Sequence, residues 1–147
     1  MHKSDSINGI SAALLTFHKE VGKVAKEANN PFFKSKYASL PNIQEAVKTP
    51  LEKAGLVYSQ FPDGQNGLTT ILMHPESGEW IGARHEMQPA KNDPQGQGSA
   101  ITYQRRYALG AILGLTIDED DDGNAASGKV SEKEYPQPLT SDDIDLD

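Results

Sequence analysis

Residues 56–87 decide the fold of this chain, through the runs Leu56-Val-Tyr-Ser-Gln-Phe61, Leu68-Thr-Thr-Ile-Leu-Met-His74 and Glu79-Trp-Ile-Gly-Ala-Arg-His-Glu-Met87. Each run is short and carries β-branched and aromatic residues, which favour strands. The two connections, Pro62–Gly67 and Pro75–Gly78, are rich in turn-forming residues and short enough for hairpins. The pattern therefore predicts three strands in an antiparallel meander.

A helix is predicted near the start of the chain. Its apolar residues recur three and four positions apart and so form one stripe along a helix: Ile7, Ile10, Leu14, Phe17, Val21, Val24 and Ala28. Asp5 or Ser6 can cap its start, and Asn29-Asn30-Pro31 ends it.

Two further helices flank the strands. The second begins after the capping residue Ser39, is expected to kink at Pro50, and ends at Gly55. Residues 88–98 are polar, contain Gly and Pro and show no period, so they are interpreted as a loop. Ser99 then caps the last helix. The order helix, helix, three strands, helix predicts an α+β fold, with helices covering one face of a three-stranded antiparallel sheet.

Charge divides the 147 residues into two regions. Residues 1–117 hold 12 Lys and Arg against 10 Asp and Glu, whereas residues 118–147 hold 2 against 11, which together give the net charge of −7. We therefore expect one mildly basic domain over residues 1–117 and an acidic, mostly disordered tail over residues 118–147. The lack of cysteine fits a reducing cytosol, and no run resembles a signal peptide or a membrane span, so a cytoplasmic protein without membrane contact is expected.

The last helix carries the residues best suited to a polyanion. Arginine matches phosphate geometry, and tyrosine offers a flat ring on which an unstacked base can lie. The same combination recurs before the second helix, and two further cations could extend it. The candidate residues for binding single-stranded DNA are Arg105, Arg106, Tyr103, Tyr107, Lys34, Lys36, Tyr37, Arg84 and Lys91.

A structural interpretation of the arginines competes with this one. Buried charges are usually paired, so Arg105 and Arg106 could instead pair with Glu86 or with the acidic block Asp118–Asp122. The chain would then be a structural or partner-binding module. Gly110 and Gly114, one turn apart, are predicted to form a notch for the close approach of a strand or a neighbouring subunit.

Catalytic motifs are scarce. There is no cysteine nucleophile and no phosphate-binding glycine loop, and the four histidines lack zinc-ligand spacing. Asp118, Asp120, Asp122 and Gly123 match the start of a calcium loop, but Lys129 stands where that loop needs its glutamate. We expect no cofactor, no bound metal and no enzymatic activity. The alternative is a metal-dependent nucleic-acid enzyme using Asp118–Asp122.

Five motifs, in order and at family-like spacing, resemble the ERF (essential recombination function) family of phages and prophages. The resemblance runs from about Ile7 to Ala126 and is carried by Asn30-Pro-Phe-Phe-Lys-Ser-Lys-Tyr-Ala-Ser-Leu40, Ser77-Gly-Glu-Trp80, Asp93-Pro-Gln95, Gly98-Ser-Ala-Ile-Thr-Tyr-Gln-Arg-Arg-Tyr-Ala-Leu109 and Asp120-Asp-Asp-Gly-Asn124.

The resemblance implies an ATP-independent protein that anneals complementary single strands in homologous recombination, as a ring or a helical filament. It also suggests the wider strand-annealing superfamily with a β-β-β-α core. In the eukaryotic members of that superfamily a basic pair on the corresponding helix lines the DNA groove, and by analogy Arg105 and Arg106 are the expected pair. A phage-encoded protein would act in the host cytoplasm, and its acidic tail could recruit replication or recombination proteins.

Overall fold

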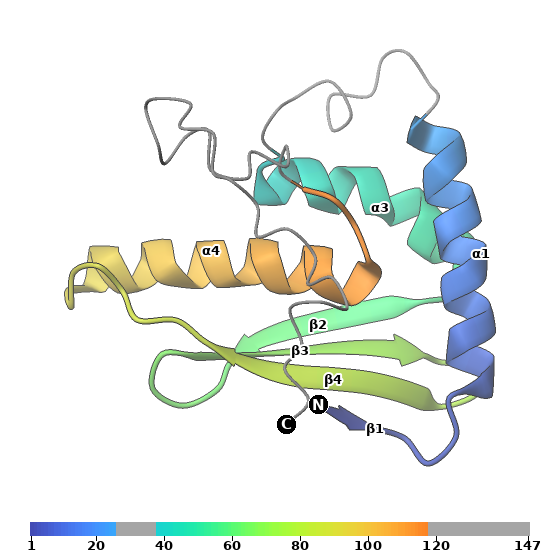
Figure 1. Cartoon of the computed structure of the whole chain (residues 1–147), viewed down its shortest axis with the longest axis horizontal. Coiled ribbons are helices and arrows are strands. Elements are labelled where there is room, and N and C mark those ends of the chain that lie inside the picture. The colour runs from blue at the N-terminus through green and yellow to red at the C-terminus, as the bar shows by residue number, and fades with distance from the viewer. Residues whose placement is uncertain (26–37, 118–147) are drawn as a thin grey trace, which may run out of the picture.

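The computed structural model describes residues 1–25 and 38–117, which form helices and strands (Figure 1). In chain order the elements are β1 (His2–Lys3), α1 (Asn8–Ala25), α3 (Leu40–Ala54), β2 (Val57–Pro62), β3 (Gly67–His74), β4 (Glu79–Glu86) and α4 (Pro94–Leu113). The architecture is α+β, as the sequence predicts. None of the helices in these two ranges is both long and apolar enough to cross a membrane.

The predicted meander is confirmed, with strand ends within one residue of the expected positions. All neighbouring strands are antiparallel, and Ile71 of β3 lies opposite both Ser59 of β2 and Gly82 of β4. The prediction of three strands is wrong, because β1 pairs with the outer side of β4 and completes the sheet order β1-β4-β3-β2. A strand of two residues is too short to show a period of two, so the sequence pattern could not reveal β1.

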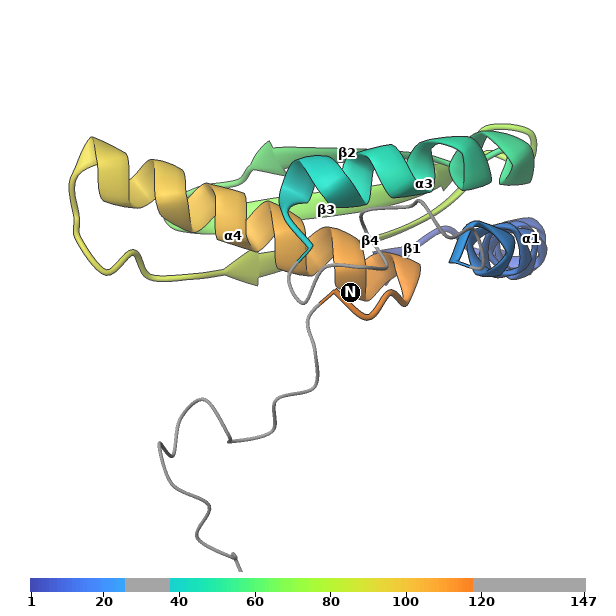
Figure 2. The same ribbon diagram turned by 90° about the horizontal axis from the view of Figure 1, so that it is seen from above.

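The core lies between the sheet and the helices. In β3 every second residue from Leu68 to His74 is buried, and this alternation gives the sheet one covered face. Helix α4 lies along that face, α3 lies on the same side, and α1 stands across the ends of the strands (Figures 1 and 2). The core side chains include Ile10, Phe17, Ile43, Val47, Leu72, Leu109 and Leu113. Each contributes about 1.5–3 kcal/mol through removal of apolar surface from water.

Local capping fixes α3 where the sequence places it. The Ser39 side chain accepts a hydrogen bond from the Asn42 amide at 3.3 Å, and Gly55 ends the helix in the left-handed conformation, with φ of 69°. The helix continues through Pro50, which is buried. At the start of α1, the Ser6 side chain lies 3.4 Å from the Asn8 amide, and a carboxylate oxygen of Glu79 on β4 accepts from the Ile10 amide at 2.8 Å.

The start of α4 differs from the prediction. The helix begins at Pro94, with Asp93 as its cap, so residues 94–98 are helical and Ser99 is not the capping residue. The Asp93 carboxylate accepts from the Gly96 amide at 2.6 Å, and Pro at the first helical position is pre-organised for a helix. Glycines lower helix propensity and hid this start. Gly96 is nevertheless required, because a Cβ there would collide with the Lys91 carbonyl.

Candidate nucleic-acid interface

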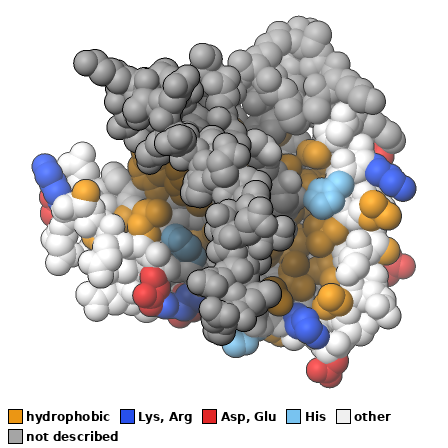
Figure 3. Space-filling view, viewed as in Figure 1, with side chains coloured by type: hydrophobic (Ala, Val, Ile, Leu, Met, Phe, Trp, Pro, Cys, Tyr) orange, Lys and Arg blue, Asp and Glu red, His pale blue; other side chains and the backbone are white. Residues whose placement is uncertain are grey.

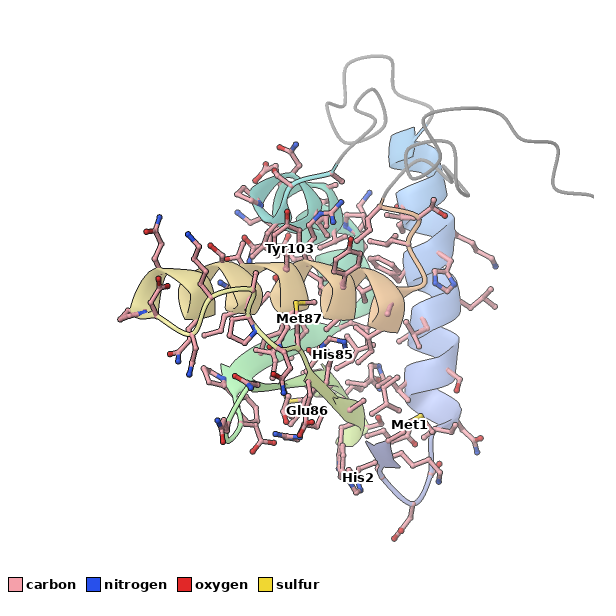
Figure 4. All side chains as sticks on the ribbon, turned by 60° about the vertical axis from the view of Figure 1, so that its left-hand side comes forward. Met1, His2, His85, Glu86, Met87 and Tyr103 are labelled. Carbon is pink, nitrogen blue, oxygen red and sulfur yellow. The ribbon has the colours of Figure 1, made fainter. Side chains whose placement is uncertain are left out.

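Tyr103 and Tyr107 form a stacked pair on the exposed side of α4. Their ring centroids are 6.3 Å apart with an interplanar angle of 18°, because residues four apart share one side of a helix. Their side chains remain 48% and 44% exposed. Figure 4 shows Tyr103 on the side of α4 away from Met87 and His85. The pair therefore offers aromatic surface to a ligand.

Two hollows meet at Tyr103. One, of about 500 Å³, is lined by the segment before α4, including Met87, Pro89 and Lys91. The other, of about 410 Å³, lies against the start of α3 and is lined by Ser39 and Pro41 among others. Both hollows are also lined by Ser99 and Tyr103, so they are adjacent along the first half of α4. The predicted candidates Tyr103 and Lys91 are thereby brought to one surface.

Arg106 is buried, with 2% of its surface exposed. Its Nε donates to the Ala38 carbonyl and one terminal nitrogen donates to the Ile117 carbonyl at 3.4 Å, while its guanidinium carbon lies 5.1 Å from the centre of the Tyr107 ring. The Ile117 carbonyl also accepts from the Ala38 amide at 3.1 Å. In this conformation Arg106 therefore holds two distant backbone segments together and supports one of the tyrosines.

Arg105 lies on a different side of the helix. Positions two residues apart differ by roughly 200° around an α-helix, so Arg105 points away from the stacked tyrosines on either side of it in sequence. The side chain of Arg105 is partly exposed, and its backbone carbonyl accepts a hydrogen bond from the side-chain amide of Gln60 at 3.0 Å. It makes no ion pair with the residues that the structure describes. The two arginines thus occupy different environments.

Arg84 clamps the turn between β2 and β3. Its guanidinium forms an ion pair with Glu86, lies 3.7 Å from the Asp63 carboxylate, and donates to the carbonyls of Asp63 and Gln65. The hydrogen bond that the Arg84 guanidinium donates to the Glu86 carboxylate raises the pKa of Arg84 above its ordinary value. A Cβ at Gly67 would collide with this guanidinium. Glu86 is therefore engaged by Arg84 and not by the arginines of α4.

The notch predicted at the glycines of α4 is occupied by the segment of this same chain that follows the helix. Helix α4 ends at Leu113 and Gly114 takes the left-handed conformation, with φ of 66°. The chain then turns back, the Leu115 amide donates to the Gly110 carbonyl at 2.8 Å, and the Ile117 side chain packs against Gly110. A Cβ at Gly110 would lie 3.0 Å from that side chain. This return segment and Ala38 were not singled out in the sequence, because backbone carbonyls leave no sequence signal.

Several predicted residues fall outside the described ranges. These are the basic and aromatic residues Lys34, Lys36 and Tyr37 and the acidic block Asp118–Asp122. Residues 1–25 and 38–117 contain nine Lys and Arg and nine Asp and Glu, so the positive excess of residues 1–117 comes from residues 26–37. Figure 3 accordingly shows Lys and Arg side chains scattered singly over the visible part of one face. Within the described ranges no three His, Cys, Asp or Glu side chains are grouped to hold a metal ion.

Comparison with known proteins identifies the family. A search of curated proteins and a search of solved structures found no significant match. The sequence model of the ERF superfamily matches residues 10–143, which is most of the 147-residue chain and includes α4 with both arginines and both tyrosines. This protein therefore belongs to the ERF superfamily, whose family-level role is DNA recombination and single-strand annealing in phages.

Proposed function

We propose that this chain binds single-stranded DNA with little sequence preference and anneals complementary strands without nucleotide hydrolysis. The observation that carries the proposal is the half-exposed stack of Tyr103 and Tyr107 beside two hollows on α4. Every base has a π-face, so stacking on tyrosine binds unpaired bases of any sequence. An exposed aromatic pair of this kind suits an unstacked strand better than a duplex.

Phosphate contacts are assigned to cations on either side of the tyrosines. Lys91 lines one hollow with Tyr103 and is exposed. Lys34 and Lys36 precede Ala38, whose carbonyl is held by Arg106 beneath Tyr107. Arg105 is partly exposed on another side of α4 and could neutralise a further phosphate as the strand crosses the helix. Arg106 acts as a positioning residue in this scheme, because its guanidinium is buried.

Annealing of this kind requires no catalytic residue. Base pairing supplies the free energy, and the protein only has to hold two strands near each other with bases free to pair. The resemblance to ERF proteins implies a ring or filament. Repetition of a weak site along such an oligomer would raise the overall affinity through effective concentration. We therefore propose a non-enzymatic oligomer as the active form.

The test compares Tyr103→Ala with Tyr103→Phe. Loss of one base–aromatic stack costs about 1–3 kcal/mol, so Tyr103→Ala should weaken binding of labelled oligonucleotides roughly 5- to 150-fold by fluorescence anisotropy. Tyr103→Phe keeps the ring and should bind like the wild type. Leu15→Ala is the control, because Leu15 is an exposed apolar residue on another helix, α1.

Annealing is measured by energy transfer between complementary labelled strands without added nucleotide. The wild type should accelerate pairing and Tyr103→Ala should lose most of that acceleration. Equal affinity of a folded Tyr103→Ala variant and the wild type would refute the stacking site. Shortening of the oligonucleotides on addition of Mg²⁺ would instead favour a metal-dependent nucleic-acid enzyme.

A further inference from the structure

Strand β2 forms an open edge of the sheet. In the order β1-β4-β3-β2 it has a partner on one side, and among the described residues no strand pairs with its other side (Figure 2). Unpaired strand edges are templates for association, and proteins usually protect them with charges, prolines or bulges. From Val57 to Phe61 the strand has no charged residue and no proline. Within the part of the chain that the structure describes, this edge is therefore unprotected over five residues.

The hydrogen-bonding groups of the edge can be placed from the ladder. The Trp80 carbonyl accepts from the residue after β1 at 2.9 Å, so Trp80 points its backbone groups away from β3. Met73 lies opposite Trp80, so its backbone N–H and C=O groups also point away from β4 and therefore toward β2. Its partner on β2, Val57, points its backbone groups toward β3. Successive residues of a strand alternate in this direction. The N–H and C=O groups of Tyr58 and Gln60 consequently face away from the sheet. They are the groups available to a second strand.

The side chains of β2 are complementary to those of a second β2. Val57 and Phe61 lie on the sheet face without helices and are 47% and 42% exposed. If two copies meet antiparallel with Ser59 opposite Ser59, each Val57 lies opposite a Phe61 of the other copy. Tyr58 of each copy then lies opposite Gln60 of the other, where their outward N–H and C=O groups can form hydrogen bonds. Cross-strand aliphatic–aromatic pairs of this kind stabilise sheets.

Charge argues for a second copy and against nucleic acid as the occupant. The strand itself carries no cation, so it cannot neutralise phosphates. Arg84 is the one Lys or Arg that the described strands place on the helix-free face, and it is already held by Glu86 and by the Asp63 carbonyl. The lack of charge also means that a two-fold axis at Ser59 opposes no like charges on the two paired strands. The opposite edge differs, because β1 covers part of β4 and Arg84 and Glu86 follow.

We propose that β2 of one copy pairs antiparallel with β2 of a second copy across a two-fold axis at Ser59, which joins the two sheets into one. Both α4 helices then lie on the same side of the joined sheet and are related by that axis. The next step rests on the proposed function: equivalent strands bound at the two α4 helices run in opposite directions, as strands must in a duplex. A two-fold contact closes at two copies, so a ring or filament needs a second contact elsewhere.

Ser59→Cys tests the axis directly. The chain contains no cysteine, so one introduced thiol can only bridge to the same position of another copy. Directly opposed residues of this ladder type have Cα atoms about 4.5 Å apart, within the range that a disulfide spans. Mild oxidation without DNA should convert most of the variant to a dimer on a non-reducing gel. The control is Thr49→Cys, an exposed position on α3. Equal cross-linking of the two variants would overturn the proposal.

A charge exchange supplies the second test. Val57→Lys with Phe61→Lys opposes like charges across the axis and should lower the molar mass measured by light scattering. Val57→Lys with Phe61→Glu opposes unlike charges and should keep the wild-type mass. Both positions are exposed, so folding should be preserved, which circular dichroism verifies. Equal masses for the two variants would also overturn the pairing.

The proposed function and the proposed β2 interface can be refuted independently of each other. The cross-linking and mass experiments contain no DNA, so dimerisation without any strand binding would refute the proposed function and leave this interface standing. Strand binding without cross-linking would do the reverse. Where both hold, the Val57→Lys, Phe61→Lys variant should anneal complementary strands more slowly than the Val57→Lys, Phe61→Glu variant.

Discussion

Arg105 and Arg106 show how neighbouring identical residues acquire different roles. The sequence predicts that both lie on a helix near two tyrosines, and that is where they lie. It does not reveal that Arg106 is buried, because its partners among the described residues include the carbonyls of Ala38 and Ile117, and every residue has a carbonyl. Arg105, one position earlier, is turned away from these partners. The burial of one arginine is thus a property of the returning chain and not of the helix.

This difference predicts that the two alanine substitutions affect different properties, stability for Arg106 and DNA binding for Arg105. Arg106→Ala leaves the buried Ala38 carbonyl without its donor and should lower the free energy of unfolding by about 1–3 kcal/mol in urea titrations. Arg105→Ala should change stability by less than about 0.5 kcal/mol. If Arg105 contacts a phosphate, its loss should reduce the slope of log Kd against log salt by about 0.7. Equal destabilisation by both substitutions would contradict this division of roles.

At the scale of elements, the features that depend on residues nearby in sequence were mostly predicted correctly, whereas those that depend on contacts distant in sequence were not predicted. The strands of the meander and the caps of α3 were predicted correctly because their turn and capping residues act on adjacent backbone. The start of α4 was misplaced because Gly96 and Gly98 mask the signal of Asp93 and Pro94. The amide of Ile10 in α1 is bound by Glu79, which is 69 positions away and has no periodic relation to the helix.

The contact between Glu79 and α1 predicts a pH dependence of stability. Hydrogen bonding from the Ile10 amide is the largest cause of a pKa of Glu79 below its ordinary value of 4.5. A lowered carboxylate pKa stabilises the folded state above the ordinary value, and this contribution is lost as the pH falls through the folded-state pKa. The melting temperature of the wild type should exceed that of Glu79→Gln at neutral pH, and the gap should narrow below about pH 4.5. A gap that does not vary with pH, measured by circular dichroism, would exclude this role.

At the scale of the whole molecule, charge is distributed by segment. The described ranges are neutral in sum, residues 26–37 carry +2, and residues 118–147 carry −9. The basic segment joins the described chain at Ala38 and the acidic tail joins it at Ile117, and these two residues share a hydrogen bond of 3.1 Å. Opposite charges therefore leave the domain from adjacent points. Sequence alone could predict the charges of the two segments, but it could not predict that they join the domain at neighbouring residues.

Competition between the acidic tail and DNA is the consequence to test. Truncation after Gly128 changes the net charge from −7 to −3, and truncation after Ile117 changes it to +2. Affinity for single strands should rise with each truncation at low salt, because the tail no longer competes for the basic segment. The three proteins should converge near 1 M salt, where the screening length falls to about 3 Å. Anisotropy titrations over a salt series measure this, with melting temperature as the control for folding. Unchanged affinity at low salt would show that the tail does not compete with DNA for the basic segment, although the two segments join the domain at the hydrogen-bonded residues Ala38 and Ile117.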